Sequence, residues 1–218
     1  MNQHRPYGLY EKLFKRVLDL LLSLFAMVIL CVPMLIIAVL VLMNLGKPVI
    51  FSQERPGKNE KIFKLYKFRT MINKTDLEGN LLPDKQRLTT FGRVLRSTSL
   101  DELPELLNII RGEMSFIGPR PLSVKYLPYY SDEERHRHDV LPGLTGLAQV
   151  NGRNSISWKE KFALDLEYVS RITFLGDLKI LIQTVLIVLR HKDIGQAEQA
   201  PVSLHIQRKE QARYDNKV

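Results

Sequence analysis

The chain has 218 residues, a formal net charge of +9 at pH 7 and a single cysteine, Cys31. Its isoelectric point of about 9.6 favours acidic partners, namely anionic lipid, phosphorylated small molecules or nucleic acid. One cysteine excludes an internal disulfide framework and a cysteine-based zinc cluster. The length suits one domain, or one domain with a membrane anchor.

A basic arm, residues 1–11, leads into an uncharged run from Leu20 to Met43. The run is roughly two dozen residues long, enough to cross the hydrocarbon core as one straight helix. A cleaved signal peptide fits poorly, because the apolar part is too long and no small-x-small cleavage site follows it. Residues 12–46 are therefore predicted to form a membrane anchor.

Pro33 lies near the middle of the run, where a proline removes a backbone hydrogen bond and kinks a helix. Basic residues flank both ends of the run, and positive charge marks the cytoplasmic side of a membrane. A single span must place one basic cluster on the opposite side. A re-entrant helix-break-helix, broken at Pro33, keeps both clusters cytoplasmic. Prolines are tolerated in membrane helices, so the charge pattern alone leaves both topologies open.

Short strand-like segments follow the anchor, at Val49–Phe51 and Ile62–Phe68. Lys67 and its basic neighbours can meet phosphate there, but beside a membrane anchor a surface role is the simpler interpretation. Residues 73–86 are polar and predict a loop, and Leu88–Leu95 predicts the start of a short helix.

Two adjacent carboxylates, Asp101 and Glu102, lie at the predicted start of the next helix. Arg96 precedes them, and a rigid Gly-Pro-Arg-Pro turn presents Arg120 after them. Acidic groups flanked by arginines suit a metal-assisted reaction on phosphate. A structural interpretation competes with this one, because Ser99 and Glu102 have the spacing of a capping box and helix dipoles favour acidic first turns. On spacing alone the capping box is the commoner explanation.

The C-terminal half contains three predicted helices. Residues 131–138 predict a capped, charged, solvated helix whose two histidines point apart and make a poor metal pair. Trp158–Val169 predicts an amphipathic helix, and Asp177–Arg190 predicts an apolar helix too short to span a membrane. Residues 191–218 predict a polar, disordered tail. The predicted fold class is a helix-rich α/β domain, residues 47–190, with little sheet.

Several enzyme classes lack their motifs here. The chain has no Walker-type phosphate loop, no dinucleotide Gly-x-Gly-x-x-Gly and no Gly-x-Ser-x-Gly elbow. The nearest approach to an Asp-x-Asp metal motif is Asp165-Leu-Glu167. Few aromatic residues interleave with the basic ones, which argues against a nucleic-acid surface. The remaining enzyme candidate is a membrane-tethered, carboxylate-centred chemistry on phosphate.

A series of short motifs follows the apolar anchor in a fixed order. They are Lys67-Phe-Arg-Thr-Met71, Phe91-Gly-Arg-Val-Leu-Arg96, Thr98-Ser-Leu-Asp-Glu-Leu-Pro104, Gly118-Pro-Arg-Pro121, Pro142-Gly-Leu-Thr-Gly146, Gln149-Val-Asn-Gly-Arg153 and Asp165-Leu-Glu-Tyr-Val169. Together they resemble the bacterial sugar transferase family, the small monotopic phosphoglycosyl transferases that begin the assembly of lipid-linked glycans. The resemblance covers the chain from about Lys12 to Arg190. Glu105 departs from the pattern, since many members carry glutamine there.

The resemblance implies a reaction and a set of roles. Asp101 matches the family's nucleophile, which attacks the β-phosphate of a UDP-sugar, releases UMP and forms an aspartyl phosphosugar. Polyprenyl (undecaprenyl) phosphate then takes the phosphosugar. Glu102 matches the residue that helps hold Mg²⁺. Arg96, Arg120 and Arg153 match phosphate contacts.

The resemblance also implies a location and a pathway. The anchor is expected to be re-entrant in the bacterial inner membrane, with the catalytic domain facing the cytoplasm. The expected role is the first membrane step of exopolysaccharide, capsule or glycoconjugate synthesis. Which UDP-sugar is used, and whether the protein is a monomer or a homodimer, stays open.

Two other functions compete with phosphoglycosyl transfer. A membrane-anchored scaffold that binds anionic lipid needs only the basic residues, so neutralising Asp101 and Glu102 leaves its function intact. A conventional glycosyltransferase with a lipid acceptor releases UDP in place of UMP. Both are distinguishable by experiment.

Overall fold

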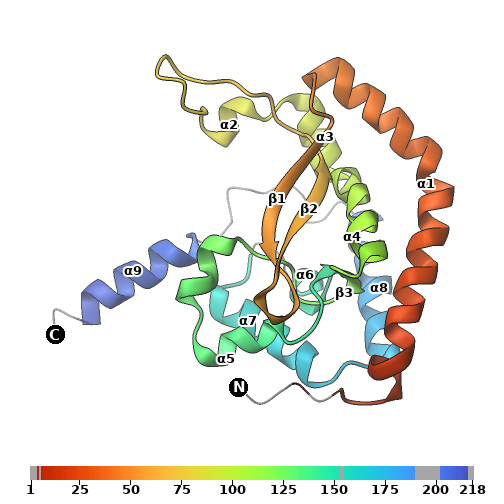
Figure 1. Ribbon diagram of the computed structural model, residues 1–218. Helices are drawn as coiled ribbons and strands as arrows, with labels where there is room; N and C mark the ends of the chain where they lie inside the picture. Colours follow the sequence, from red (N-terminus) through yellow and green to blue (C-terminus); the bar gives the residue numbers. More distant parts are fainter. Residues whose placement is uncertain (1–3, 5, 153–154, 190–201, 216–218) are drawn as a thin grey trace.

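The computed structural model describes residue 4 and residues 6–152, 155–189 and 202–215. Its longest element is α1 (Lys15–Leu45), a single helix of 31 residues that follows the short π-helix η1 (Tyr10–Phe14). At about 1.5 Å per residue, α1 is on the order of 45 Å long. The helix contains Pro33 and changes direction along its length (Figure 1). The expected helix-break-helix is therefore one continuous, bent helix.

One face of α1 packs onto the rest of the chain. Its buried residues recur at helical spacing: Asp19, Ser23, Ile37, Val41 and Leu45. Toward the C-terminal end, this face joins Phe68 and Leu95 in an apolar cluster. Toward the N-terminal end, Asp19 Oδ1 accepts a 3.2 Å hydrogen bond from the backbone N–H of Phe116. Both halves of α1 therefore contact the same body of the protein.

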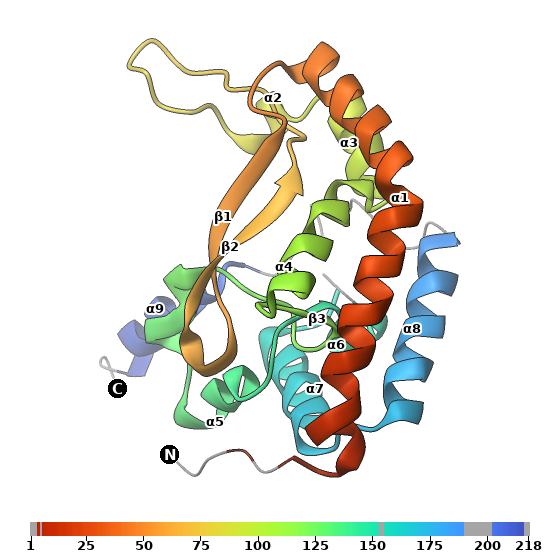
Figure 2. The ribbon, with the colours of Figure 1, turned by 45° about the vertical axis from the view of Figure 1, so that its right-hand side comes forward.

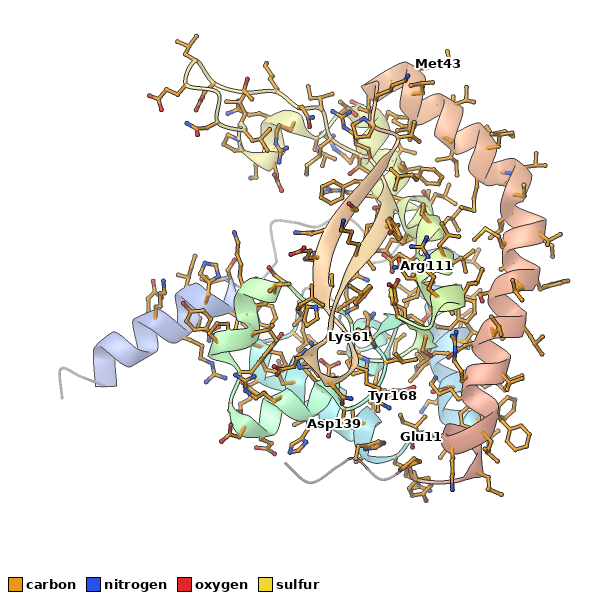
Figure 3. The ribbon with its side chains drawn as sticks, viewed as in Figure 1. Glu11, Met43, Lys61, Arg111, Asp139 and Tyr168 are labelled. Atoms are coloured by element: carbon orange, nitrogen blue, oxygen red, sulfur yellow. The ribbon has the colours of Figure 1, made fainter. Side chains whose placement is uncertain are left out.

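The opposite face of α1 is apolar and exposed, with side chains that project away from the domain (Figure 3). Large exposed residues on this helix include Phe25, Val28, Ile29, Val32, Leu35, Ile36 and Met43. By length and composition, the helical segment Tyr10–Leu45 is able to cross a membrane. The prediction of an apolar anchoring helix is confirmed at this level.

Helix α8 (Phe174–Leu189) lies beside the N-terminal part of α1 in both ribbon views (Figures 1 and 2). Lys15 Nζ donates a 2.6 Å hydrogen bond to Asp177 Oδ2, and the ring of Tyr10 packs edge-on against Phe174. Asp177 and Ile180 are the buried residues of α8. The remaining apolar residues of α8 leave it with an exposed face beside that of α1.

Two small sheets complete the scaffold. Strands are found at both predicted segments, as β1 (Ile50–Pro56) and β2 (Ile62–Phe68). Their antiparallel pairing around η2 (Lys58–Glu60) was not predicted. The parallel pair of β3 (Ser115–Ile117) and β4 (Gly143–Thr145) was not predicted.

The remaining helices confirm a helix-rich α/β domain. They are α2 (Asp84–Arg87), α3 (Thr90–Ser97), η3 (Leu100–Glu105), α4 (Leu106–Arg111), η4 (Val124–Tyr129), α5 (Asp132–Arg135), η5 (His136–His138), α6 (Leu147–Val150), α7 (Trp158–Ser170) and α9 (Leu204–Asp215). The predicted cap before α5 is confirmed, because Ser131 and Glu134 form a capping box. The prediction that residues 131–138 are solvated is wrong at the C-terminal end of this segment, where Arg137 and His138 are buried.

Part of the segment expected to be disordered is helical. Leu204 of α9 is 1% exposed and packs with Tyr130, Trp158 and Phe162. Trp158 Nε1 donates a 2.8 Å hydrogen bond to the carbonyl of Val202. The polar composition of this segment did not reveal that α9 packs on the domain, because Leu204 alone, among the described side chains of α9, supplies its buried apolar contact. The rest of the expected tail, 191–201 and 216–218, lies outside the described residues.

Glycine allows two of the motifs to meet backbone to backbone. A Cβ on Gly92 of α3 would lie 1.8 Å from the carbonyl oxygen of Thr70. The Phe91–Arg96 motif therefore packs directly on the Lys67–Met71 motif. A similar approach joins β3 to β4, where a Cβ on Gly143 would lie 2.1 Å from the backbone nitrogen of Gly118.

We expect Gly92→Ala to destabilise the fold by about 3 kcal/mol or more, because a backbone carbonyl cannot turn aside for the new methyl group. Chemical unfolding in detergent measures the loss. Gly8→Ala is the matched control, since nothing lies within 4 Å of a Cβ at Gly8. If the two variants unfold at the same denaturant concentration as the parent protein, the close packing of α3 on Thr70 is wrong.

Candidate active site

The two predicted catalytic carboxylates lie in η3, a 3-10 turn that leads into α4. Ser99, before the turn, has left-handed φ and ψ angles of 57° and 15°, and its side chain makes no capping hydrogen bond. The Glu102 side chain does not return to Ser99. Its Oε1 accepts hydrogen bonds from Lys67 Nζ and Arg120 Nη2, each at 2.6 Å. The predicted capping box is therefore wrong, and an ion-paired carboxylate takes its place.

Glu102 is held in its ionised form. Burial by itself would raise the pKa of Glu102, but the charges of Arg120 and Lys67, with their hydrogen bonds, lower it well below its usual range. The Glu102 carboxylate in turn raises the pKa of Arg120. These three groups form a fixed, charged frame beside Asp101.

Asp101 has a different environment from its neighbour. Its side chain is buried, and no described residue forms a side-chain hydrogen bond or ion pair with it. Burial and the Glu102 charge raise the pKa of Asp101 to about 6, against the opposing charges of Lys67, Arg96 and Arg120. A desolvated carboxylate with cations nearby but none bound to it suits a nucleophile for an anionic substrate.

The structure brings four of the five predicted catalytic and phosphate-binding residues together: Arg96, Asp101, Glu102 and Arg120. Arg96 reaches the site from α3, and its Nε donates a 2.9 Å hydrogen bond to Thr70 Oγ1. Arg153 lies outside the described residues. Pro33, the predicted anchor break, lies within α1.

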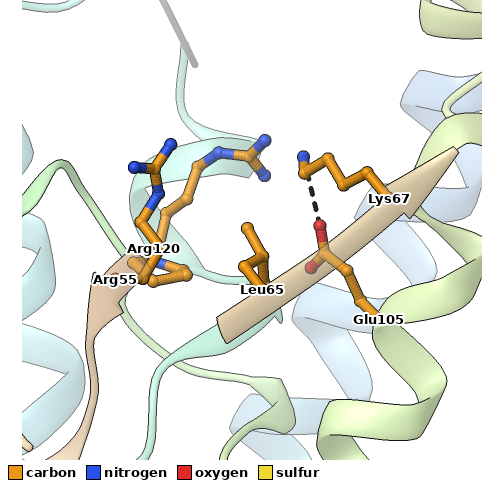
Figure 4. Close-up of a pocket in the computed structure, with 6 residues that line it drawn as sticks. Arg55, Leu65, Lys67, Glu105 and Arg120 are labelled. Carbon is orange, nitrogen blue, oxygen red and sulfur yellow. Dashed lines mark ion pairs between the residues drawn. The ribbon is translucent and has the colours of Figure 1, made fainter. Parts of the chain in front are cut away.

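Lys67 belongs to the site, contrary to its simpler interpretation as a surface residue. Its Nζ lies 2.6 Å from Glu102 Oε1. It also lies 3.1 Å from Glu105 Oε1, the ion pair drawn in Figure 4. The sequence contains a pattern that indicates the inward position of Lys67. Lys67 follows Phe63 and Leu65 at alternate positions of one strand, so all three share the inward face.

A buried ion pair between Arg137 and Asp165 helps to position Arg120. Arg137 Nη2 donates hydrogen bonds of 2.8 Å to both Asp165 Oδ2 and the backbone carbonyl of Arg120. The side chains of Arg137 and Asp165 are 1% and 2% exposed. Burial would lower the pKa of Arg137, but the Asp165 charge raises it. Asp165, noted for its likeness to a metal motif, thus pairs with an arginine.

The carboxylates offer hard oxygen donors of the kind that Mg²⁺ prefers. Within the described residues, no group of three or more His, Cys, Asp or Glu side chains is placed to hold a metal ion. Mg²⁺ commonly takes one or two carboxylates and completes its shell with substrate phosphates and water. Glu102 and Asp101 therefore offer oxygen donors of the type that suits Mg²⁺, and the described residues do not form a complete protein cage for it.

Glu105 combines burial with a negative neighbour. Its side chain is 2% exposed, and burial together with the Glu102 charge raises the pKa of Glu105 to about 7. The folded protein therefore disfavours ionised Glu105, and stability falls as pH rises from the unfolded value near 4.5 through 7.

We expect Glu105→Gln to stabilise the protein at pH 8 by on the order of 2 kcal/mol, because the amide never ionises. The advantage over the parent protein should vanish below pH 4.5, where Glu105 is protonated in both folded and unfolded states. Chemical unfolding at pH 8 and pH 4.5 tests this, with the exposed Glu133→Gln as control. Equal gains at both pH values would contradict the ionisation argument.

Comparisons with known proteins show the family of the chain. The chain is 50% identical over 184 residues to the uncharacterized sugar transferase EpsL of Bacillus subtilis, covering 84% of this chain and 91% of EpsL. It is 34% identical over 197 residues to an undecaprenyl-phosphate galactose phosphotransferase of Salmonella typhimurium, covering 83% of this chain and 41% of that protein. It is 35% identical over 197 residues to an undecaprenyl-phosphate glucose phosphotransferase of Komagataeibacter xylinus, covering 84% of this chain and 37% of that protein. The profile of the bacterial sugar transferase family matches residues 10–191, and the chain belongs to that family.

Proposed function

We propose that the protein is a phosphoglycosyl transferase that moves a phosphosugar from a UDP-sugar to undecaprenyl phosphate and releases UMP. The observation that carries this proposal is Asp101, a buried carboxylate that lies among three positive side chains and is ion-paired to no residue in the described part of the chain. Relatives named as undecaprenyl-phosphate galactose and glucose phosphotransferases support the acceptor and a phosphosugar as the transferred group.

In the first step, a carboxylate oxygen of Asp101 attacks the β-phosphorus of the UDP-sugar. The bond from that phosphorus to the bridging oxygen breaks, and UMP leaves with the electron pair. Like charges oppose this attack, so the phosphate must be neutralised. Lys67, Arg96 and Arg120 supply positive charge, and an arginine fork matches phosphate oxygens in pairs. When bound at Glu102, Mg²⁺ supplies further charge to the phosphoryl oxygens.

In the second step, a phosphate oxygen of undecaprenyl phosphate attacks the phosphorus of the aspartyl phosphosugar. The acyl–phosphate P–O bond breaks and restores the Asp101 carboxylate. Because the two displacements use one nucleophile in turn, one site serves first a soluble donor and then a lipid acceptor.

A re-entrant anchor fits this chemistry. Both halves of α1 contact the same domain. Helices α1 and α8, which both carry large exposed apolar residues, lie side by side (Figure 2). Such a helix enters and leaves by the cytoplasmic leaflet and keeps the site near the lipid phosphate. Labelling of Gln3→Cys and Ser52→Cys in a Cys31→Ser background tests the topology. Labels on opposite sides of the membrane would contradict it.

The function is tested by incubating the purified protein with Mg²⁺, undecaprenyl phosphate and a panel of UDP-sugars. Release of UMP with at least one sugar is expected. Release of UDP would indicate a conventional glycosyltransferase. The alternative of a lipid-binding scaffold would be favoured by two results together. The protein would release no nucleotide from any UDP-sugar, and neutralising Asp101 and Glu102 would leave lipid binding unchanged.

A further inference from the structure

A small pocket lies next to Lys67 and Arg120 (Figure 4). Its lining residues come from four separate segments: Arg55, Leu65, Lys67, Glu105, Arg120 and Pro121. Lys67 and Arg120 also bind Glu102, so the pocket adjoins the predicted reaction site. Arg55 enters the pocket from β1 and has no role in the reaction described above.

The Arg55 side chain is only partly satisfied. Its Nη2 donates to Gln53 Oε1 at 2.6 Å, and its Nη1 donates to the carbonyl of Glu54 at 3.2 Å. Its Nε is buried without a hydrogen-bond partner among the described residues. A buried donor that gives up water without gaining an acceptor is unfavourable, so a missing acceptor is indicated.

The charge balance of the pocket points to an anion. Three cationic groups, from Arg55, Lys67 and Arg120, line it, together with the acidic Glu105 (Figure 4). Glu102 pairs with Lys67 and Arg120, whereas Arg55 has no acidic partner among the described residues. Burial and the nearby Arg120 charge lower the pKa of Arg55, which means that the two guanidinium groups repel each other. An anion between them removes the repulsion and accepts from the free Nε.

We propose that Arg55 and Arg120 form a second phosphate subsite, beside the reacting phosphate at Asp101. The proposal rests on the proposed function, because a diphosphate donor presents two phosphates and only one of them is attacked. The ligand is a phosphate ester group, supplied either by the nucleotide or by the polyprenyl phosphate. Strand β1 lies farther than β2 from the exposed face of α1, which favours the soluble nucleotide (Figures 1 and 2).

The test is equilibrium binding of two probes to the full chain in detergent: UMP, and a short-chain polyprenyl phosphate. Arg55→Gln removes the charge and the fork, and Arg55→Lys keeps the charge alone. Lys64→Gln is the matched control, since Lys64 is exposed on the other face of the neighbouring strand. We expect Arg55→Gln to weaken UMP binding by about tenfold, Arg55→Lys by less, and Lys64→Gln by less than about twofold, as for a charge-assisted hydrogen bond.

Weaker binding of UMP alone assigns the subsite to the nucleotide, and weaker binding of polyprenyl phosphate alone assigns it to the acceptor. If Arg55→Gln weakens neither probe more than Lys64→Gln does, the subsite is wrong. Should Arg55→Gln fail to fold, the comparison of Arg55→Lys with Lys64→Gln decides by the same criterion. A parent protein that releases UMP from UDP-sugar while Arg55 variants bind both probes normally would refute this subsite and leave the proposed function standing.

Discussion

Asp101→Asn is expected to lower the rate of UMP release by about 10³-fold or more, because the amide cannot act as the nucleophile. The change is nearly isosteric and removes a charge that burial already disfavours, so the variant should fold. Intact-protein mass spectrometry after incubation with UDP-sugar, without acceptor, should show a phosphosugar adduct on the parent protein and none on the variant. Asp84→Asn is the control, because the Asp84 side chain is 73% exposed on α2.

The pKa of Asp101 predicts how the rate of adduct formation falls at acidic pH. The pKa of Asp101 is about 6, and the nucleophile must be ionised. The rate of adduct formation should therefore rise with pH between about 5 and 7 and level off above, following the fraction of ionised carboxylate. Substantial turnover by Asp101→Asn, or an adduct on another residue, would remove Asp101 from its assigned role.

Asp165→Asn is expected to cost about 3–5 kcal/mol of stability, because it leaves a buried guanidinium without a counter-charge. Arg137 would lose its partner while still holding the Arg120 carbonyl at 2.8 Å. The free energy of unfolding in detergent measures this cost. Activity of the folded fraction should fall as well, since Arg137 positions the segment that carries Arg120.

The control for the buried pair is Arg208→Gln, which breaks the ion pair of Arg208 with Glu134. The Arg208 side chain is 37% exposed, and exposed pairs contribute about 1 kcal/mol or less. A similar small cost for both variants would mean that the Arg137–Asp165 pair does not support the fold.

Local patterns in the sequence were sufficient for much of the scaffold. The apolar run predicted α1, alternation predicted β2, and helical periodicity predicted α7 and α8. These predictions succeed because each depends on neighbours within a few positions of the chain. The order of the motifs indicated which arginines belong to the site of Asp101. In the structure, Arg96 and Arg120 lie near Asp101.

Long-range contacts decided the rest. Ser99 and Glu102 have the spacing of a capping box, yet Lys67, 35 positions away, binds Glu102. Spacing cannot reveal this outcome, because a carboxylate forms the stronger interaction with a buried cation than with a backbone N–H. The same limit applies to α9, where one leucine finds an aromatic cluster that is distant in sequence.

By itself, the sequence determined a membrane-attached, helix-rich chain with a carboxylate pair among arginines, because periodicity, charge and motif order are local properties. The tertiary structure alone decided that Glu102 is ion-paired, while Asp101 is buried and has no side-chain partner among the residues that the structure describes. It also alone placed Arg55 beside Arg120 in one pocket. Burial and ion pairing arise only when distant segments meet, and they distinguish the two adjacent carboxylates.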